Sequence, residues 1–167
     1  MELDIDLEGW SAGAWPELAE RCVEAACAVA PELANPRLAV SLLFTSDEEV
    51  HGLNRQWRGK DKPTNVLSFP MLERAELLAL PADGPPEMLG DIALAAQTCA
   101  REAEEKGLPL DHHAAHLIIH GLLHLVGHDH EISSADAETM EKLEIKALAI
   151  LGIANPYSGD PLQQGDE

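Results

Sequence analysis

Two spacings of apolar residues, alternating and helical, divide the chain into predicted strands and helices. Leu3, Ile5 and Leu7 alternate with acidic residues, which is typical of a half-buried strand. Residues 15–30 follow with helical spacing, and Pro31 ends that predicted helix. Further elements are predicted in this order: a strand at 37–45, a helix at 47–57 capped by Ser46 or Asp47, strands at 65–70 and 89–95, and helices at 95–106, from Asp111 onward, and from Ser133 to Gly152.

This order of elements predicts an α+β (mixed α/β) fold in one layered domain over residues 1–154. An about four-stranded mixed sheet should pack against about four or five helices, with a central helix that carries a metal site. Residues 71–88, with three prolines, are expected to form a partly helical or mobile excursion at the rim of the sheet. Residues 155–167 are expected to be a mobile C-terminal tail. The last helix should bury Met140, Leu143, Ala147 and Ile150.

Composition restricts where the protein works and what it binds. Eleven Lys and Arg residues against 30 Asp and Glu give a net charge of −19, which disfavours general binding to membranes or nucleic acid. A nucleic-acid substrate would therefore need a local concentration of cations. No apolar run is long enough to span a membrane, and the acidic N-terminus is unlike a signal peptide. Three cysteines without a C-x-x-C pair favour a reduced protein in the cytoplasm.

The segment "HGLLHLVGHDH", residues 120–130, has the spacing of a three-histidine metal site. His120 and His124 lie one helical turn apart, so their imidazoles can converge on one ion. Gly127 can take the left-handed conformation that ends a helix, which would allow the chain to return His130 to the same ion. Three imidazoles leave a fourth coordination position open, as in catalytic zinc sites. The sequence therefore predicts one zinc ion per chain.

One position in this segment separates it from the zinc proteases. They carry a glutamate, which takes a proton from zinc-bound water, where this chain has Gly121. The predicted cage is thus protease-like without the base for proteolysis. Asp129 fits either of two supporting roles, orienting an imidazole or capping the turn. The four remaining histidines nearby are expected in solvent or in supporting positions: His112, His113, His116 and His128.

A second segment, "LNRQWRGKDKPTNVLSFP" at residues 53–70, holds the one clear basic cluster. Arg55, Arg58, Lys60 and Lys62 are four of the eleven cations. The composition alone fits either a solvated loop or an anion-recognition site. Arginine suits the second reading because its planar guanidinium donates two parallel hydrogen bonds to a phosphate.

These two segments and "LGDIALA", in this order and spacing, resemble the bacterial YbeY family over roughly residues 37–152. The resemblance implies a cytoplasmic, zinc-dependent endoribonuclease that acts in ribosomal RNA maturation and ribosome quality control. It also implies site residues, position by position: His120, His124 and His130 as metal ligands, Arg58 as the catalytic arginine, and Asp91 at an acidic position. The family usually has Asp where this chain has Asn65, so a role that needs that carboxylate is lost here.

The interpretation that follows is a single-strand-specific, zinc-dependent endoribonuclease. Arg58 would stabilise the charge that develops on the phosphoryl oxygens. The expected supporting residues are Asp129, Asp91 and Gly127, and the expected RNA contacts are Arg55, Lys60 and Lys62. Ribosomal RNA and components of the small ribosomal subunit are the expected partners. Two alternatives stay open: a non-catalytic ribosome assembly factor that contains zinc, and a metallopeptidase with a base from another position.

Overall fold

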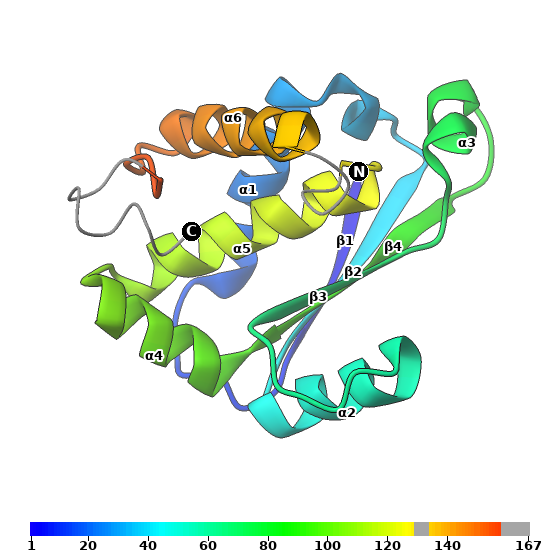
Figure 1. Ribbon diagram of the computed structural model, residues 1–167. Coiled ribbons are helices and arrows are strands. Elements are labelled where there is room, and N and C mark those ends of the chain that lie inside the picture. Colours follow the sequence, from blue (N-terminus) through cyan, green and yellow to red (C-terminus); the bar gives the residue numbers. More distant parts are fainter. Residues whose placement is uncertain (129–133, 158–167) are drawn as a thin grey trace.

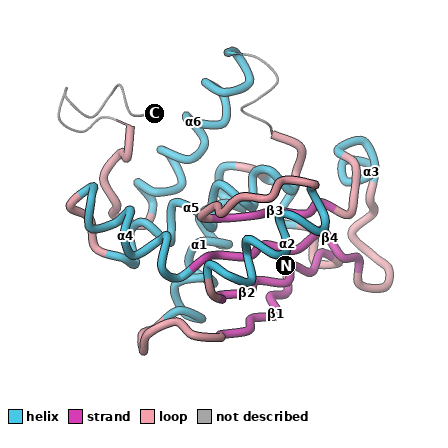
Figure 2. The backbone as a smooth tube through the Cα atoms, turned by 60° about the horizontal axis from the view of Figure 1, so that its bottom comes forward, coloured by secondary structure: helices cyan, strands magenta, loops and turns pink. Residues whose placement is uncertain are grey.

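A four-stranded sheet forms the middle layer of the fold. Its strands span Glu2–Leu7 (β1), Leu38–Thr45 (β2), Val66–Pro70 (β3) and Glu87–Ala95 (β4). The computed structural model describes residues 1–128 and 134–157, and the strand order across the sheet is β1-β2-β4-β3 (Figure 2). β1, β2 and β4 are parallel, whereas β3 runs antiparallel to β4 at the edge. The mixed sheet is therefore confirmed.

Helices cover both faces of this sheet. The described residues form six α-helices and one short 3-10 helix: Trp15–Val29 (α1), Pro31–Ala34 (η1), Asp47–Arg58 (α2), Arg74–Ala79 (α3), Ala96–Lys106 (α4), Leu110–Leu125 (α5) and Ser134–Ile150 (α6). Figure 1 shows α1, α5 and α6 on one side of the sheet and α2 on the other. α5 contacts α1, α4, α6, β3 and β4, so it is the central helix of its layer.

Local chemistry fixes several helix ends. The Ser46 side chain caps α2 by accepting a hydrogen bond of 3.2 Å from the Glu49 N–H. Asp47, the other candidate cap, instead accepts two hydrogen bonds of 2.8 Å from Thr98 and so joins the start of α2 to α4. α4 ends where Gly107 takes a left-handed φ of 67°.

Two apolar clusters hold the layers together. The larger lies between the sheet and the helices α1, α5 and α6, and it includes Phe44, Ile92 and Leu122. The smaller lies between the sheet and α2, around Val50 and Leu67. The helix that carries the histidines therefore rests on the larger core.

The α+β class and the single domain of layered sheet and helices are confirmed, with three local corrections. The expected excursion at 71–88 contains helix α3, which raises the helix count above the four or five predicted. Ile150 is 57 % exposed, and Leu148 is buried instead, because the buried stripe of α6 follows Met140, Glu144 and Leu148. Leu7 is 46 % exposed at the end of edge strand β1. Every helix of the described residues is too short or too polar to cross a bilayer.

The expected tail begins with residues that the structure describes. The Tyr157 hydroxyl donates a 3.1 Å hydrogen bond to Glu144 of α6. Its ring meets His116 edge-on, with ring centroids 5.4 Å apart. The packed part of the chain thus extends to at least Tyr157, and residues 158–167 lie outside the described residues.

Gly90 sets the distance between β4 and α5. A Cβ atom at this position would lie 2.5 Å from the Phe69 carbonyl oxygen and 2.6 Å from Leu125 Cδ2. Gly90→Ala should therefore lower the free energy of unfolding, measured in urea, by about 1–3 kcal/mol. Gly52→Ala is the control, because nothing lies within 4 Å of its added Cβ in α2. That variant should gain about 0.5–1 kcal/mol; equal stability of the two variants would contradict the packing argument.

Candidate active site

Three histidines form a ladder along one face of α5. His116, His120 and His124 follow one another at intervals of four residues, which places their side chains on the same face. The ring centroids are 6.5 Å apart for His116 and His120 and 4.7 Å apart for His120 and His124. The structure thus brings together two of the three predicted metal ligands, His120 and His124.

The glycine hinge after this ladder has the predicted form. Gly127 has a φ of 101°, and its N–H donates to the His124 carbonyl at 3.0 Å. The His128 N–H reaches the Leu123 carbonyl at 3.1 Å, so the two bonds make a Schellman helix end. The Arg74 guanidinium also donates to the Val126 carbonyl at 2.6 Å. These contacts satisfy carbonyl groups that the end of α5 leaves open.

The chain beyond this hinge lies outside the described residues, and with it the predicted ligand His130 and the supporting Asp129. Within the described part of the chain, no three His, Cys, Asp or Glu side chains are grouped as for a metal ion. The structure therefore describes two of the predicted ligands, His120 and His124, and the helix α5 that carries them.

A buried carboxylate on α6 holds the histidine ladder from behind. Glu144 is 1 % exposed, and its Oε1 accepts from His116 Nε2 at 2.8 Å and from His120 Nδ1 at 3.2 Å. The Tyr157 hydroxyl reaches the same oxygen. Because Nδ1 of His120 is engaged by Glu144, Nε2 is the ring nitrogen on the far side of the imidazole from this carboxylate.

The ionisation of Glu144 follows from these contacts. Burial alone would raise the pKa of this carboxyl, but the hydrogen bonds and charges of His116 and His120 lower it to about 2. Glu144 is thus a carboxylate at neutral pH, and it favours the tautomer of His120 that carries its proton on Nδ1.

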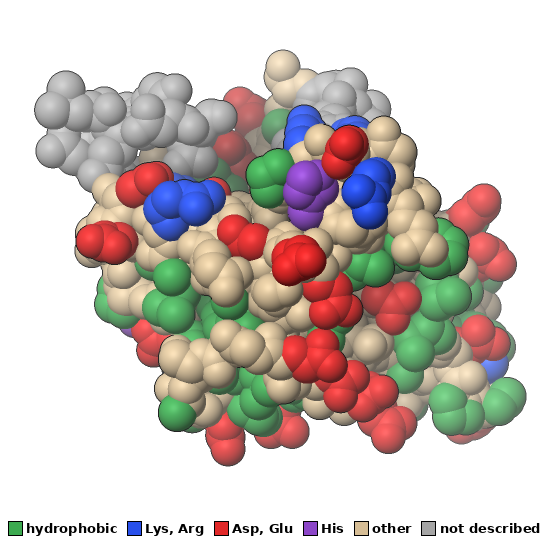
Figure 3. All heavy atoms as spheres, turned by 90° about the horizontal axis from the view of Figure 1, so that it is seen from below, with side chains coloured by type: hydrophobic (Ala, Val, Ile, Leu, Met, Phe, Trp, Pro, Cys, Tyr) green, Lys and Arg blue, Asp and Glu red, His purple; other side chains and the backbone are tan. Residues whose placement is uncertain are grey.

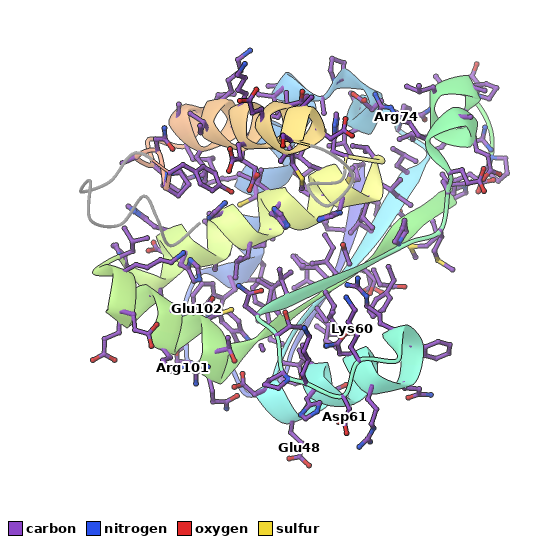
Figure 4. The ribbon with its side chains drawn as sticks, viewed as in Figure 1. Glu48, Lys60, Asp61, Arg74, Arg101 and Glu102 are labelled. Atoms are coloured by element: carbon purple, nitrogen blue, oxygen red, sulfur yellow. The ribbon has the colours of Figure 1, made fainter. Side chains whose placement is uncertain are left out.

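A cleft of about 460 Å³ lies in front of the ladder. One wall is formed by His120, Gly121 and His124, and the opposite wall by Arg58, Lys60 and Lys62. Figure 4 shows Lys60 between α2 and β3. Histidines and cations about 60 residues apart in sequence therefore meet in one cavity, with edge strand β3 between them.

Hydrogen bonds to α2 hold the basic turn in place. The side-chain amide of Asn54, which is 2 % exposed, donates to the Lys62 carbonyl at 2.9 Å. The Lys60 N–H donates to the Asn54 carbonyl at 3.2 Å, and the Asp61 carboxylate lies 2.8 Å from His51 Nε2. Gly59 has a φ of 68°, which turns the chain directly after Arg58. The backbone of the turn is therefore anchored at Lys60 and at Lys62.

Two other predicted residues lie away from this cleft. Arg55 is exposed one turn before Arg58 and does not line the cavity. Asp91 lines a separate groove with Leu53 and Trp57 on the side of the sheet that faces α2. The structure does not bring either residue to the histidine ladder.

Asn65 lies at the rim of the cleft and takes part in a polar network. Its side-chain amide donates to Glu102 Oε1 at 2.9 Å, and the same oxygen lies 2.9 Å from Nε2 of the buried His113. An Asp at position 65 could not donate this bond and would set two carboxylates against each other. The amide of Asn65 is therefore matched to Glu102 in this chain.

Gly121 has a packing role. It is buried, and a Cβ atom here would lie 3.0 Å from Ile92 Cδ1 on β4. A side chain at this position, such as the glutamate of zinc proteases, would crowd Ile92. The glycine lets α5 approach the sheet closely.

Glu144 is the functional candidate that the sequence reasoning missed. A signal for it exists: Glu144 lies four residues after Met140 and four before Leu148, on the stripe of α6 that is otherwise apolar. An acidic residue in such a stripe is buried only with a partner. Here the partners are the histidines of α5.

Comparison with known proteins gives the family. A family model described as "Endoribonuclease YbeY" matches residues 8–152. A protein of that name from Erythrobacter litoralis is 64 % identical over 94 % of this chain and 98 % of its own. Another, from Novosphingobium aromaticivorans, is 58 % identical over 95 % of each chain. A solution structure of a Thermotoga maritima protein aligns with a TM-score of 0.56 at 26 % identity, covering 94 % of this chain and 97 % of that one.

The fold and the extent of these matches define a hydrolase of the endoribonuclease class. The chain belongs to the endoribonuclease YbeY family. The resemblance recognised in the histidine and basic segments is thereby confirmed.

Removal of the Glu144 charge should destabilise the metal-free protein at neutral pH. Glu144→Gln replaces a charge-assisted acceptor with a neutral one, at a cost of about 1–3 kcal/mol in the free energy of unfolding. The folded state lowers the pKa of Glu144 from 4.5 to about 2. Its stabilising contribution is therefore complete above about pH 4.5 and lost as the pH falls towards 2.

Urea unfolding with a chelator present, between pH 7 and pH 3, measures this contribution. The difference between parent and Glu144→Gln should shrink as the pH falls below about 4.5. Glu138→Gln, on an exposed position of the same helix, is the control and should match the parent throughout. A difference that stays constant with pH would contradict the role given to the carboxylate.

Proposed function

We propose that this chain is a zinc-dependent, single-strand-specific endoribonuclease that acts in the cytoplasm on ribosomal RNA, during maturation and quality control of the small ribosomal subunit. One observation carries the proposal: a single cleft has histidines of α5 on one wall and Arg58, Lys60 and Lys62 on the other. Membership of the YbeY family supports the same activity.

The donor set suits a zinc ion. His120 and His124 would hold it together with His130. Metal-binding histidines commonly donate their second ring N–H to a carboxylate, and Glu144 accepts from His120 Nδ1 at 3.2 Å. That contact fixes the ring of His120 and keeps its Nε2 unprotonated, as a ligand must be. Three imidazoles leave one coordination position for water or a phosphate oxygen.

The cations of the opposite wall would bind the substrate. Arg58 can donate two parallel hydrogen bonds to the scissile phosphate and stabilise charge as it develops on the phosphoryl oxygens. Lys60 and Lys62 would contact neighbouring phosphates as point charges. A bound zinc ion supplies a Lewis acid for phosphoryl oxygens and lowers the pKa of bound water.

Gly121 is compatible with this chemistry. A phosphodiester carries its own charge, and RNA offers its 2′-hydroxyl as a nucleophile, so the protease glutamate is dispensable. The absence of a carboxylate at position 121 also spares an anionic substrate from repulsion inside the cleft. The single-strand preference and the ribosomal partners rest on the resemblance to the family.

The ligand assignment predicts about one zinc ion per purified chain. His124→Ala should reduce the zinc content to near zero after dialysis, because two imidazoles bind far more weakly than three. His112→Ala, on the first turn of the same helix, is the control and should keep the parental content. Metal analysis of the three proteins, with circular dichroism to check folding, decides the matter. Full zinc in folded His124→Ala would disprove the assignment.

The role of Arg58 predicts a large loss of cleavage without loss of zinc. Arg58→Ala should slow single-turnover cleavage of single-stranded RNA by about 10²–10³-fold, the usual effect of removing a transition-state donor. Arg58→Lys should recover only part of the rate, because an ammonium keeps the charge but not the two-pronged geometry.

Arg55→Ala is the matched control for Arg58, one turn earlier on α2 and outside the cleft. It should cleave RNA within a few-fold of the parent. If Arg58 only attracted RNA, lysine would replace it almost fully, and raising the salt concentration would remove the differences between variants. Parental cleavage by zinc-loaded Arg58→Ala would refute the mechanism.

A further inference from the structure

An apolar groove lies on the side of β3 opposite the histidine cleft. It measures about 470 Å³, and Leu53, Trp57, Phe69, Met71 and Asp91 are among its lining residues. We call it the Trp57 groove. Trp57 is 67 % exposed and Met71 61 % exposed, and apolar side chains grouped in one exposed groove are typical of a binding site. Figure 3 shows hydrophobic side chains at the surface of the molecule's underside, where acidic side chains are widespread and the basic ones gather in small groups.

The groove and the cleft adjoin. Pro70 lines both cavities, at the end of edge strand β3. α2 contributes to both cavities as well, because Arg58 lines the cleft and the preceding residue, Trp57, lines the groove. Arg58 and Trp57 are consecutive in α2, so an RNA chain whose phosphate is bound by Arg58 can place an adjacent base near Trp57.

The chemistry of the groove suits a base and not a phosphate. An exposed indole offers a flat face on which any base can stack. Asp91 presents a carboxylate that makes no side-chain hydrogen bond or ion pair with the described residues. A carboxylate repels the phosphate backbone but accepts hydrogen bonds from the amino groups of bases.

We propose that the Trp57 groove is a nucleobase subsite, in which the base next to the phosphate held by Arg58 stacks on Trp57. Asp91 accepts a hydrogen bond from the exocyclic amino group of that base, so adenine, cytosine or guanine is preferred to uracil there. The inference rests on the proposed function, because it takes RNA as the ligand of the adjoining cleft. The subsite accepts only an unpaired base, because a base that is paired inside a duplex cannot enter it.

Binding of a short single-stranded RNA with 2′-O-methyl sugars, which cannot attack its own phosphates, tests the subsite separately from cleavage. A series of such oligonucleotides carries one abasic residue at each position in turn. One position should be sensitive in the parent, with binding weakened roughly 5- to 150-fold, the range for loss of one stacked base. Trp57→Ala should bind the intact oligonucleotide with a similar loss and show no sensitive position.

Conservative variants distinguish stacking from general packing. Trp57→Phe should keep most of the affinity, because it retains an aromatic face. Parent fluorescence should be quenched by RNA while the fluorescence of Trp57→Phe stays unchanged, since Trp15 is 6 % exposed and Trp10 is partly buried. Asp91→Asn should reduce the preference for amino-bearing bases over uracil at the sensitive position. Leu78→Ala, at a residue that is 59 % exposed on α3 and outside the groove, is the control and should behave as the parent.

The outcomes separate this inference from the proposed function. If Trp57→Ala binds every oligonucleotide of the series as the parent does, the subsite is refuted, and the groove is left as a surface for a protein partner. If the parent shows the single sensitive position but cleaves no RNA with zinc bound, the subsite stands and the nuclease proposal fails.

Discussion

The close packing of α5 against β4 is the constraint on which the candidate site depends. Two glycines allow it: at Gly90 an added Cβ would meet the Phe69 backbone and Leu125, and at Gly121 it would meet Ile92. Because interiors are close-packed, α5 cannot shift without reopening the core. The histidines lie on the face of α5 beside β3, and their distance from Arg58 is fixed by this contact and by the anchored turn that follows α2.

Glu144 adds an electrostatic constraint to this packing. A carboxylate that is 1 % exposed is stable only with strong partners, and here these are His116, His120 and Tyr157. The interaction works in both directions, since the histidines keep Glu144 ionised and Glu144 sets the orientation of His120. α6 and the segment that carries Tyr157 therefore support the ladder, although neither contributes a residue to the cleft.

The sequence predicted correctly those features of the site that depend only on residues close together in the chain. The spacing of His120 and His124 and the hinge at Gly127 needed only the geometry of one helix and its end. Glu144 was not predicted, because its burial depends on how α6 is rotated against α5, and the inward position expected for Ile150 misjudged that rotation. The meeting of Arg58 with the histidines depends on topology: β3, which follows the basic turn, pairs antiparallel with β4 at the edge of the sheet, and this pairing brings the turn into one cleft with α5. For Arg58 the resemblance to a family supplied what periodicity could not.

A net charge of −19 is compatible with an anionic substrate, because the effect of each charge depends on its distance from the bound phosphate. At physiological ionic strength, charges farther than about 8 Å from a phosphate are largely screened, so the cations that touch it decide its binding. Arg58, Lys60 and Lys62 share one wall of the cleft, whereas Asp91 lies in the separate groove. An acidic surface elsewhere then has a selective effect. RNA that lies across the acidic surface at random meets repulsion, whereas in the proposed binding mode a strand gains attraction where its phosphate meets Arg58, Lys60 and Lys62.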